Sequence, residues 1–152
     1  MRGGWLHTQI LIEPIRRCFA DLGAATYIEY PVKCDGRNCA VDLFVLLAGK
    51  RVAVEAELSP DRVPMDILKA RALDTDLLYI VTPTRRVALA AKKRGCQPRK
   101  RPAIFYITVG QALQQLKRDF VRCFPLCFPM ENKSIPQAGP SIVRPISQRR
   151  VP

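Results

Sequence analysis

Three strand-like segments joined by two tight turns dominate the first third of this chain. The segments are rich in β-branched and aromatic residues and span residues 25–32, 39–48 and 51–58. Asp35-Gly36 separates the first two segments, and Gly49-Lys50 separates the last two. Dipeptides of this kind favour hairpins. The sequence therefore predicts a three-stranded antiparallel meander.

Helical patterns surround the meander. Helices are expected over residues 5–22, 59–73, 84–95 and 111–120, and two further strands over residues 76–83 and 103–109. Pro14 is expected either to kink the first helix or to open a new one. The short apolar segment 76–83 follows a helix, which favours parallel pairing. The order α-β-β-β-α-β-α-β-α predicts an α/β fold with a mixed central sheet flanked by helices.

The length and composition predict one domain with a basic tail. The 152 residues suffice for a single core, which we expect in residues 1–120. Residues 121–152 are rich in proline and scattered cations, and we expect them to be extended or disordered. The 25 Lys and Arg residues exceed the 13 Asp and Glu residues, which gives a net charge of +12. This surplus favours a polyanionic partner such as DNA.

No apolar run approaches the ~20 residues that a membrane-spanning helix needs, and the N-terminus lacks the pattern of a secretory signal. We therefore expect a cytoplasmic protein with reduced cysteines and no membrane partner. The alternative for the cysteines is a four-thiolate zinc site made by Cys34, Cys39, Cys123 and Cys127. Their spacing does not match a zinc knuckle, so we expect them to act as small hydrophobic residues.

Two glutamates interrupt the third strand. Residues two apart in a strand share a face, so Glu55 and Glu57 are expected to point together, away from the face of Val52. Asp42 interrupts the apolar run of the neighbouring strand in the same way. A turn at Gly49-Lys50 would place Asp42 opposite residues 56–58, close to Glu57.

Three carboxylates in the centre of a sheet would repel one another and lose their hydration. A divalent cation such as Mg²⁺ or Mn²⁺ offsets both costs, because it prefers hard oxygen ligands and leaves room for a phosphate oxygen. The pattern therefore predicts a metal site made by Asp42, Glu55 and Glu57. The alternative is that the glutamates lie at a strand edge or on a solvated face of the sheet.

The order of these motifs resembles the PD-(D/E)XK nuclease superfamily, which includes type II restriction enzymes and Holliday-junction resolvases. The resemblance covers residues 5–83, through a first helix, a hairpin with VDLFV, a strand with VEAE, a helix and the strand LLYIVTP. It implies a restriction-endonuclease-like fold and metal-dependent hydrolysis of phosphodiester bonds.

The resemblance also implies roles for individual residues. Asp42 and Glu55 match the two metal-binding acids of the superfamily. Glu57 stands where most members have a lysine, although members with an E-x-E strand are thought to use this glutamate to activate water. Glu13 matches a first-helix glutamate that some members add. Lys69, on the following helix, is the candidate to supply the charge of the missing lysine.

A basic segment with no acidic residue follows the fourth strand. Its cations are Arg85, Arg86, Lys92, Lys93, Arg94, Arg99, Lys100 and Arg101. The segment predicts a phosphate-contacting surface with strong salt dependence and little base specificity. The alternative is a solvated basic face. His7, the single histidine, is expected on the surface of the first helix.

These patterns support a metal-dependent DNA endonuclease that uses Mg²⁺ or Mn²⁺. The first alternative is a catalytically inactive, nuclease-like DNA-binding module of a mobile-element or DNA-processing complex. A weaker alternative is a basic RNA-binding protein. We expect a homodimer, because resolvases and many restriction enzymes cut as symmetric dimers.

Overall fold

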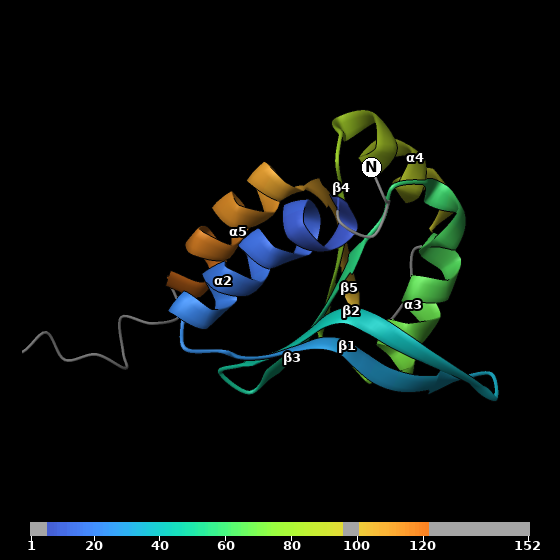
Figure 1. Cartoon of the computed structure of the whole chain (residues 1–152), viewed down its shortest axis with the longest axis horizontal. Helices are drawn as coiled ribbons and strands as arrows, with labels where there is room; N and C mark the ends of the chain where they lie inside the picture. Colours follow the sequence, from blue (N-terminus) through green and yellow to red (C-terminus); the bar gives the residue numbers. More distant parts are fainter. Residues whose placement is uncertain (1–5, 96–100, 122–152) are drawn as a thin grey trace, which may run out of the picture.

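The computed structural model describes residues 6–95 and 101–121, which form a five-stranded sheet with helices on both faces (Figure 1). The strands are β1 (Ala25–Cys34), β2 (Arg37–Leu47), β3 (Lys50–Ala56), β4 (Leu77–Thr82) and β5 (Ala103–Thr108). They lie in the order β1-β2-β3-β4-β5. The first three pair antiparallel, and β3, β4 and β5 pair parallel. The predicted α/β class with a mixed sheet is confirmed.

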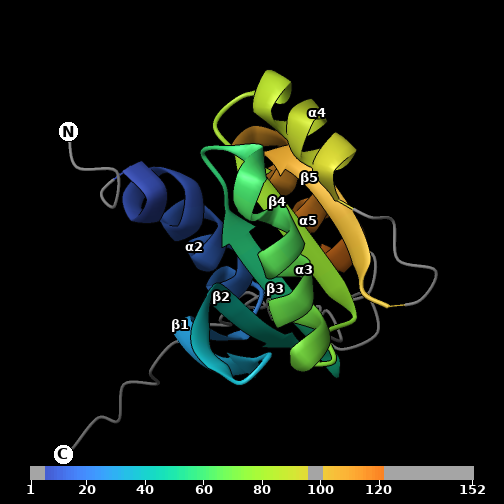
Figure 2. The same cartoon turned by 90° about the vertical axis from the view of Figure 1, so that its right-hand side faces the viewer.

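The helices form two layers. They are η1 (a π-helix, Leu6–Ile12), α2 (Glu13–Asp21), η2 (a 3₁₀ helix, Pro60–Arg62), α3 (Val63–Ala72), α4 (Arg85–Arg94) and α5 (Val109–Val121). Figures 1 and 2 show α2 and α5 on one face of the sheet and α3 and α4 on the other. The predicted order of helices and strands is confirmed, and Pro14 lies in the first turn of a new helix, α2.

The expected tail, residues 121–152, lies outside the described residues apart from Val121, the last residue of α5. Within the described ranges, no helix is long and apolar enough to cross a membrane.

The two hairpin turns determine which residues of the first three strands face each other. Asp35 and Gly36 connect β1 to β2, and both have positive φ, as a type I′ turn requires. Ala48 and Gly49 connect β2 to β3 with φ values of 50° and 74°. Glycine tolerates this conformation without the clash that a side chain introduces.

The predicted position of the second turn was wrong by one residue, and this changes the register of the β2–β3 pair by two. Leu47 pairs with Lys50, so the turn is Ala48-Gly49 and not Gly49-Lys50. Continuing the observed register places Asp42 opposite Glu55. The prediction that Asp42 lies opposite residues 56–58 is therefore wrong.

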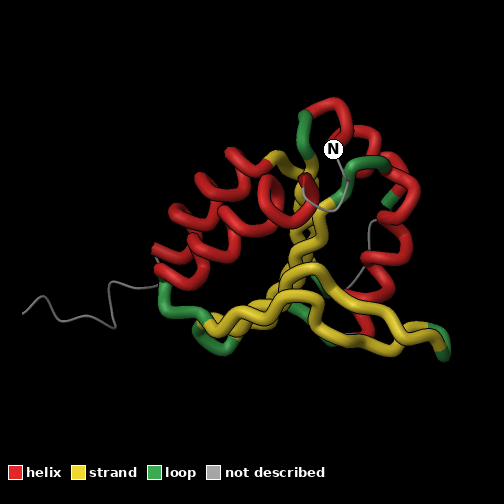
Figure 3. Tube along the Cα trace, in the orientation of Figure 1, coloured by secondary structure: helices red, strands yellow, loops and turns green. Residues whose placement is uncertain are grey.

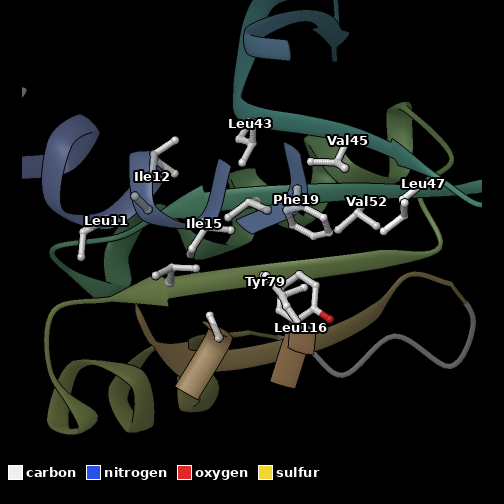
Figure 4. Close-up of a cluster of buried hydrophobic side chains, with 14 residues drawn as sticks. Leu11, Ile12, Ile15, Phe19, Leu43, Val45, Leu47, Val52, Tyr79 and Leu116 are labelled. Carbon is white, nitrogen blue, oxygen red and sulfur yellow. The ribbon is translucent and has the colours of Figure 1, made fainter. Parts of the chain in front are cut away.

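The larger hydrophobic cluster lies between the sheet and the helices α2 and α5 (Figure 4). Phe19 of α2 and Leu116 of α5 are fully buried there, and Tyr79 of β4 is nearly so. The ring of Tyr79 also stacks on that of Phe105, with 5.2 Å between ring centroids. Every second residue of β3 joins this cluster, from Val52 to Ala56, as strand alternation predicts.

A second cluster lies beneath α3 and α4. Val63, Ile67 and Ala70 of α3 pack there against Ala53 of β3. The odd-numbered residues of β2 divide between the two clusters at Asp42: Cys39 and Val41 contact the second cluster, and Leu43, Val45 and Leu47 belong to the first. Figure 3 shows the cause, because the β1–β2 hairpin crosses beneath both helical layers.

We predict that Phe19→Ala lowers the free energy of unfolding by about 3–5 kcal/mol, because a fully buried aromatic side chain leaves a cavity behind. Urea unfolding followed by circular dichroism measures the loss. Leu89→Ala is the control, because Leu89 on α4 is 55% exposed and its truncation should cost little. Equal losses in the two variants would contradict the packing described here.

Candidate active site

A carboxylate marks the point at which β2 and β3 stop pairing. The last paired residues of the two strands are Leu43 and Val54. One residue further, Asp42 Oδ2 accepts a hydrogen bond of 2.8 Å from the backbone N–H of Ala56. The Asp42 side chain thus supplies the acceptor that a neighbouring strand would otherwise offer. Because the strands no longer pair beyond Asp42, a cavity can form there.

The cavity has a volume of about 270 Å³ and is lined largely by ionisable groups. These are His7, Cys39, Asp42, Glu55, Glu57, Arg62, Asp66 and Lys69. They come from η1, β2, β3, the residue after β3, η2 and α3. Four of the predicted site residues, Asp42, Glu55, Glu57 and Lys69, therefore lie around one cavity.

Lys69 links two of the buried carboxylates. Its Nζ lies 2.8 Å from Glu55 Oε1 and 2.9 Å from Asp66 Oδ1, and it donates a hydrogen bond of 3.1 Å to the carbonyl oxygen of Ala40. Glu55 and Asp66 are only 1% and 2% exposed. One ammonium group thus partly compensates two carboxylates that are removed from water.

Burial and mutual repulsion favour the neutral forms of these acids. Burial raises the pKa of Glu55 well above its ordinary value, and the charges of Asp66 and Asp42 add to this effect against the opposing charge of Lys69. Burial, opposed by Lys69, also raises the pKa of Asp66. The same environment raises the pKa of Lys69, because burial is outweighed by its two carboxylate partners.

Glu57 and Asp66 form a hydrogen-bonded pair of carboxyl groups. Burial, followed by the charge of Asp66 and the hydrogen bond to it, raises the pKa of Glu57 to about 8. Asp66 Oδ2 is buried and has no hydrogen-bond partner among the described residues. The raised pKa favours a proton on Glu57 at neutral pH, beside Asp66.

The pKa of Asp42 is lowered, in contrast to those of the other three acids, so Asp42 is ionised at neutral pH. Burial opposes its ionisation, but hydrogen bonds from His7 and the Ala56 N–H outweigh this and lower the pKa of Asp42. His7 Nε2 lies 3.0 Å from Asp42 Oδ2, and this hydrogen bond raises the pKa of His7. The expectation that His7 belongs to the helix surface is wrong, because His7 lines the cavity.

Glu13 does not reach the cavity. Its carboxylate accepts hydrogen bonds of 2.7 and 2.8 Å from Arg16 and one of 2.8 Å from Arg17, all within α2. These hydrogen bonds lower the pKa of Glu13 to about 2. The structure thus places this glutamate on α2, away from Asp42 and Glu55.

The predicted basic surface is partly described. Arg85, Arg86, Lys92, Lys93 and Arg94 are exposed along α4, whereas Arg99 and Lys100 lie outside the described residues. Arg101 is exposed beside β5 and pairs with Asp76 at 2.9 Å. Arg94 of α4 lies 3.3 Å from Asp61 of η2. This ion pair links α4 to η2, whose Arg62 lines the cavity.

The cysteines that the structure describes, Cys18, Cys34 and Cys39, are free thiols. Cys123 and Cys127, the other half of the alternative zinc site, lie outside the described residues. Over residues 6–95 and 101–121, no three His, Cys, Asp or Glu side chains are gathered as in a formed metal site. Within those residues, Lys69 pairs with Glu55 and Asp66, His7 pairs with Asp42, and the raised pKa of Glu57 favours its protonated form.

Asp66, His7 and Arg62 are the charged or titratable cavity residues that the sequence reasoning missed. Asp66 had a usable signal, because it lies on the buried face of α3 with Val63, Ile67 and Ala70 and stands three residues before Lys69. An acid at such a position requires a partner. His7 had no comparable signal, because only the folded chain brings it to Asp42.

Searches against protein-family models, curated proteins and solved structures returned no match to this chain.

We predict that the titration of Glu57 lowers the free energy of unfolding as the pH rises in metal-free buffer. The folded protein holds a proton on Glu57 up to about pH 8, whereas the unfolded chain releases it near pH 4.5. The resulting stabilisation is complete below pH 4.5 and is lost as the pH rises through 8. Glu57→Gln keeps the shape without the titrating proton, so its free energy of unfolding should fall less between pH 5.5 and 8.5.

Urea unfolding in EDTA at several pH values measures this difference. Asp61→Asn is the matched control, because Asp61 is an exposed carboxylate outside the cavity and its variant should retain the fall seen in the unaltered chain. Parallel curves for the unaltered chain and Glu57→Gln would contradict the prediction.

Proposed function

We propose that this protein is a metal-dependent DNA endonuclease of the PD-(D/E)XK type, with a restriction-endonuclease-like fold. The observation that carries the proposal is the meeting of Asp42, Glu55 and Lys69 at one cavity, from β2, β3 and α3. This is the set of one aspartate, one glutamate and one lysine that the resemblance implies. Lys69 comes from α3, the α-helix that follows β3. Glu57 occupies the position at which most members of the superfamily have the lysine.

The residues present suit a divalent cation such as Mg²⁺ or Mn²⁺. Asp42, Glu55, Glu57 and Asp66 offer carboxylate oxygens around a cavity of about 270 Å³, and hard oxygen donors are what these cations prefer. A bound cation could replace the proton that burial keeps on Glu57 and add to the charge of Lys69 beside Glu55 and Asp66. We assign Asp42 and Glu55 as the principal ligands and Glu57 as a third.

A divalent cation, when bound, polarises a phosphodiester and favours ionisation of water. The side chains of the cavity have separate roles beside the cation. Lys69 holds Glu55 by an ion pair and brings positive charge to the place where a phosphate would gain negative charge. Glu57, which lines the same cavity, would orient a water molecule where it does not itself bind the cation.

The helix α4 offers a path for DNA beside the cavity. Arg85 and Arg86 at its start, and Lys92 and Lys93 near its end, are exposed cations. Such groups contact phosphates and contribute affinity with little sequence information. The ion pair between Arg94 and Asp61 connects this surface to the cavity wall.

We predict that the purified protein nicks supercoiled plasmid DNA with Mg²⁺ or Mn²⁺ and not in EDTA. Asp42→Ala and Glu55→Gln should each lower the rate by roughly 100-fold or more, because cation binding supplies several kcal/mol of transition-state stabilisation. Asp21→Ala, at the exposed end of α2, is the control and should cut at a nearly unchanged rate. Cleavage that survives Asp42→Ala, or none by the unaltered protein, would refute the proposal.

We also predict that the double variant Arg85→Ala and Arg86→Ala weakens DNA binding. Two lost phosphate contacts should flatten the plot of log affinity against log salt concentration by about 2. Fluorescence anisotropy with duplex DNA at several salt concentrations measures this slope. Arg17→Ala on α2 is the control, because α2 lies on the opposite face of the sheet. An equal effect in both variants would contradict a role for α4.

A second candidate is a DNA-binding module without catalytic activity. Lys69 already neutralises part of the buried charge of Glu55 and Asp66, which supports a cavity that persists without a cation. This candidate predicts salt-sensitive DNA binding that Glu55→Gln leaves unchanged, and no rise in melting temperature with Mn²⁺. Preference for RNA over duplex DNA in the same assay would favour the RNA-binding alternative.

A further inference from the structure

His7 forms a pair with Asp42 at the cavity and has no role in the proposed chemistry. His7 Nε2 lies 3.0 Å from Asp42 Oδ2, and the two side chains are 29% and 22% exposed. Asp42 is ionised and can only accept hydrogen bonds, so His7 Nε2 is the donor. The bond is therefore charge-assisted, which makes it stronger than a bond between neutral groups.

The unusual helix η1 places His7 at this position. A π-helix repeats its hydrogen bonds every five residues, and such turns are rare and frequent at functional sites. His7 precedes Leu11 by four residues and Ile12 by five, so this wide turn brings it to the side of the helix that they occupy. Leu11 and Ile12 are each 1% exposed and belong to the core cluster. The burial of these two side chains therefore directs His7 inward.

Both hydrogen bonds to Asp42 use the same oxygen atom. Asp42 Oδ2 accepts from His7 Nε2 and from the Ala56 N–H, at 3.0 and 2.8 Å. Neither bond involves Oδ1, although Asp42 lines the cavity. The two donors thus restrain the rotation of the carboxylate and leave its second oxygen for another partner.

We propose that His7 is a positioning residue that holds Asp42 Oδ2, so that Asp42 Oδ1 serves as the ligand of the divalent cation. This inference rests on the proposed function, because it requires that Asp42 bind the cation. Hydrogen-bond partners of metal ligands orient them, and their loss typically lowers metal affinity by about 10–100-fold. His7 donates through Nε2 whether it is neutral or charged, so the role does not depend on its titration.

The test compares three substitutions of His7 in the full chain, with Mn²⁺ as the probe. Glutamine places an amide nitrogen at the same number of bonds from Cβ as Nε2, whereas asparagine places it one bond short. His7→Gln should therefore retain the Mn²⁺ affinity, and His7→Asn and His7→Ala should weaken it by about 10–100-fold. Binding is followed by the Mn²⁺ concentration at which half of the rise in melting temperature is reached.

The melting temperature in EDTA separates positioning from a structural role. If His7→Ala and His7→Asn lower that temperature but leave the Mn²⁺ midpoint unchanged, the inference is overturned. It is also overturned if glutamine weakens binding as much as asparagine, because His7 would then act as a ligand or through its ring.

Plasmid cleavage by the unaltered chain separates this inference from the proposed function. Mn²⁺ binding with the expected order of His7 variants but no cleavage would refute the nuclease and keep the inference. Cleavage by the unaltered chain, together with equal Mn²⁺ midpoints in all His7 variants, would keep the nuclease and refute the inference. If Mn²⁺ raises the melting temperature of neither the unaltered chain nor Asp42→Ala, the nuclease and the role of His7 are both refuted.

Discussion

The hydrogen bond from the Ala56 N–H to the Asp42 carboxylate allows the sheet to open where the cavity lies. A backbone N–H that loses its partner strand costs free energy when it is buried. Asp42 supplies the missing acceptor, and β2 can then leave β3 and cross beneath α3. The same carboxylate faces the cavity and holds His7. One side chain thus serves the backbone and the proposed chemistry together.

Charge compensation in the cavity follows from that opening. Glu55, Glu57 and Asp66 are removed from water, and each must be neutralised by a cation or a proton. Lys69 forms ion pairs with Glu55 and Asp66, and burial favours a proton on Glu57. Removing one partner of such a set typically destabilises a protein by about 3–5 kcal/mol. A cavity of this kind is therefore costly to the fold, and in the proposed function a divalent cation would offset part of that cost.

Much of the fold followed from local patterns, and the parts that did not have identifiable causes. Alternation in VAVEAE correctly placed Val52 and Val54 in the core and both Glu55 and Glu57 at the cavity. The pairing of Asp42 failed because the turn uses Ala48, whose positive φ is uncommon for a residue with a side chain. Lys69 was predictable because it lies one helix after the strand. Placing His7 required knowledge of how η1 docks, which no local pattern supplies.

The two-residue turn at Ala48 and Gly49 has a consequence for how this chain can diverge. Surface turns are ordinarily the sites where proteins tolerate insertions. Here the turn length decides which residue of β3 faces Asp42, because a one-residue slip changes the face of every side chain in the strand. An insertion between Leu47 and Lys50 would separate Asp42 from Ala56 and Glu55 without touching the cavity. Length variation among descendants of this chain should therefore accumulate in other loops.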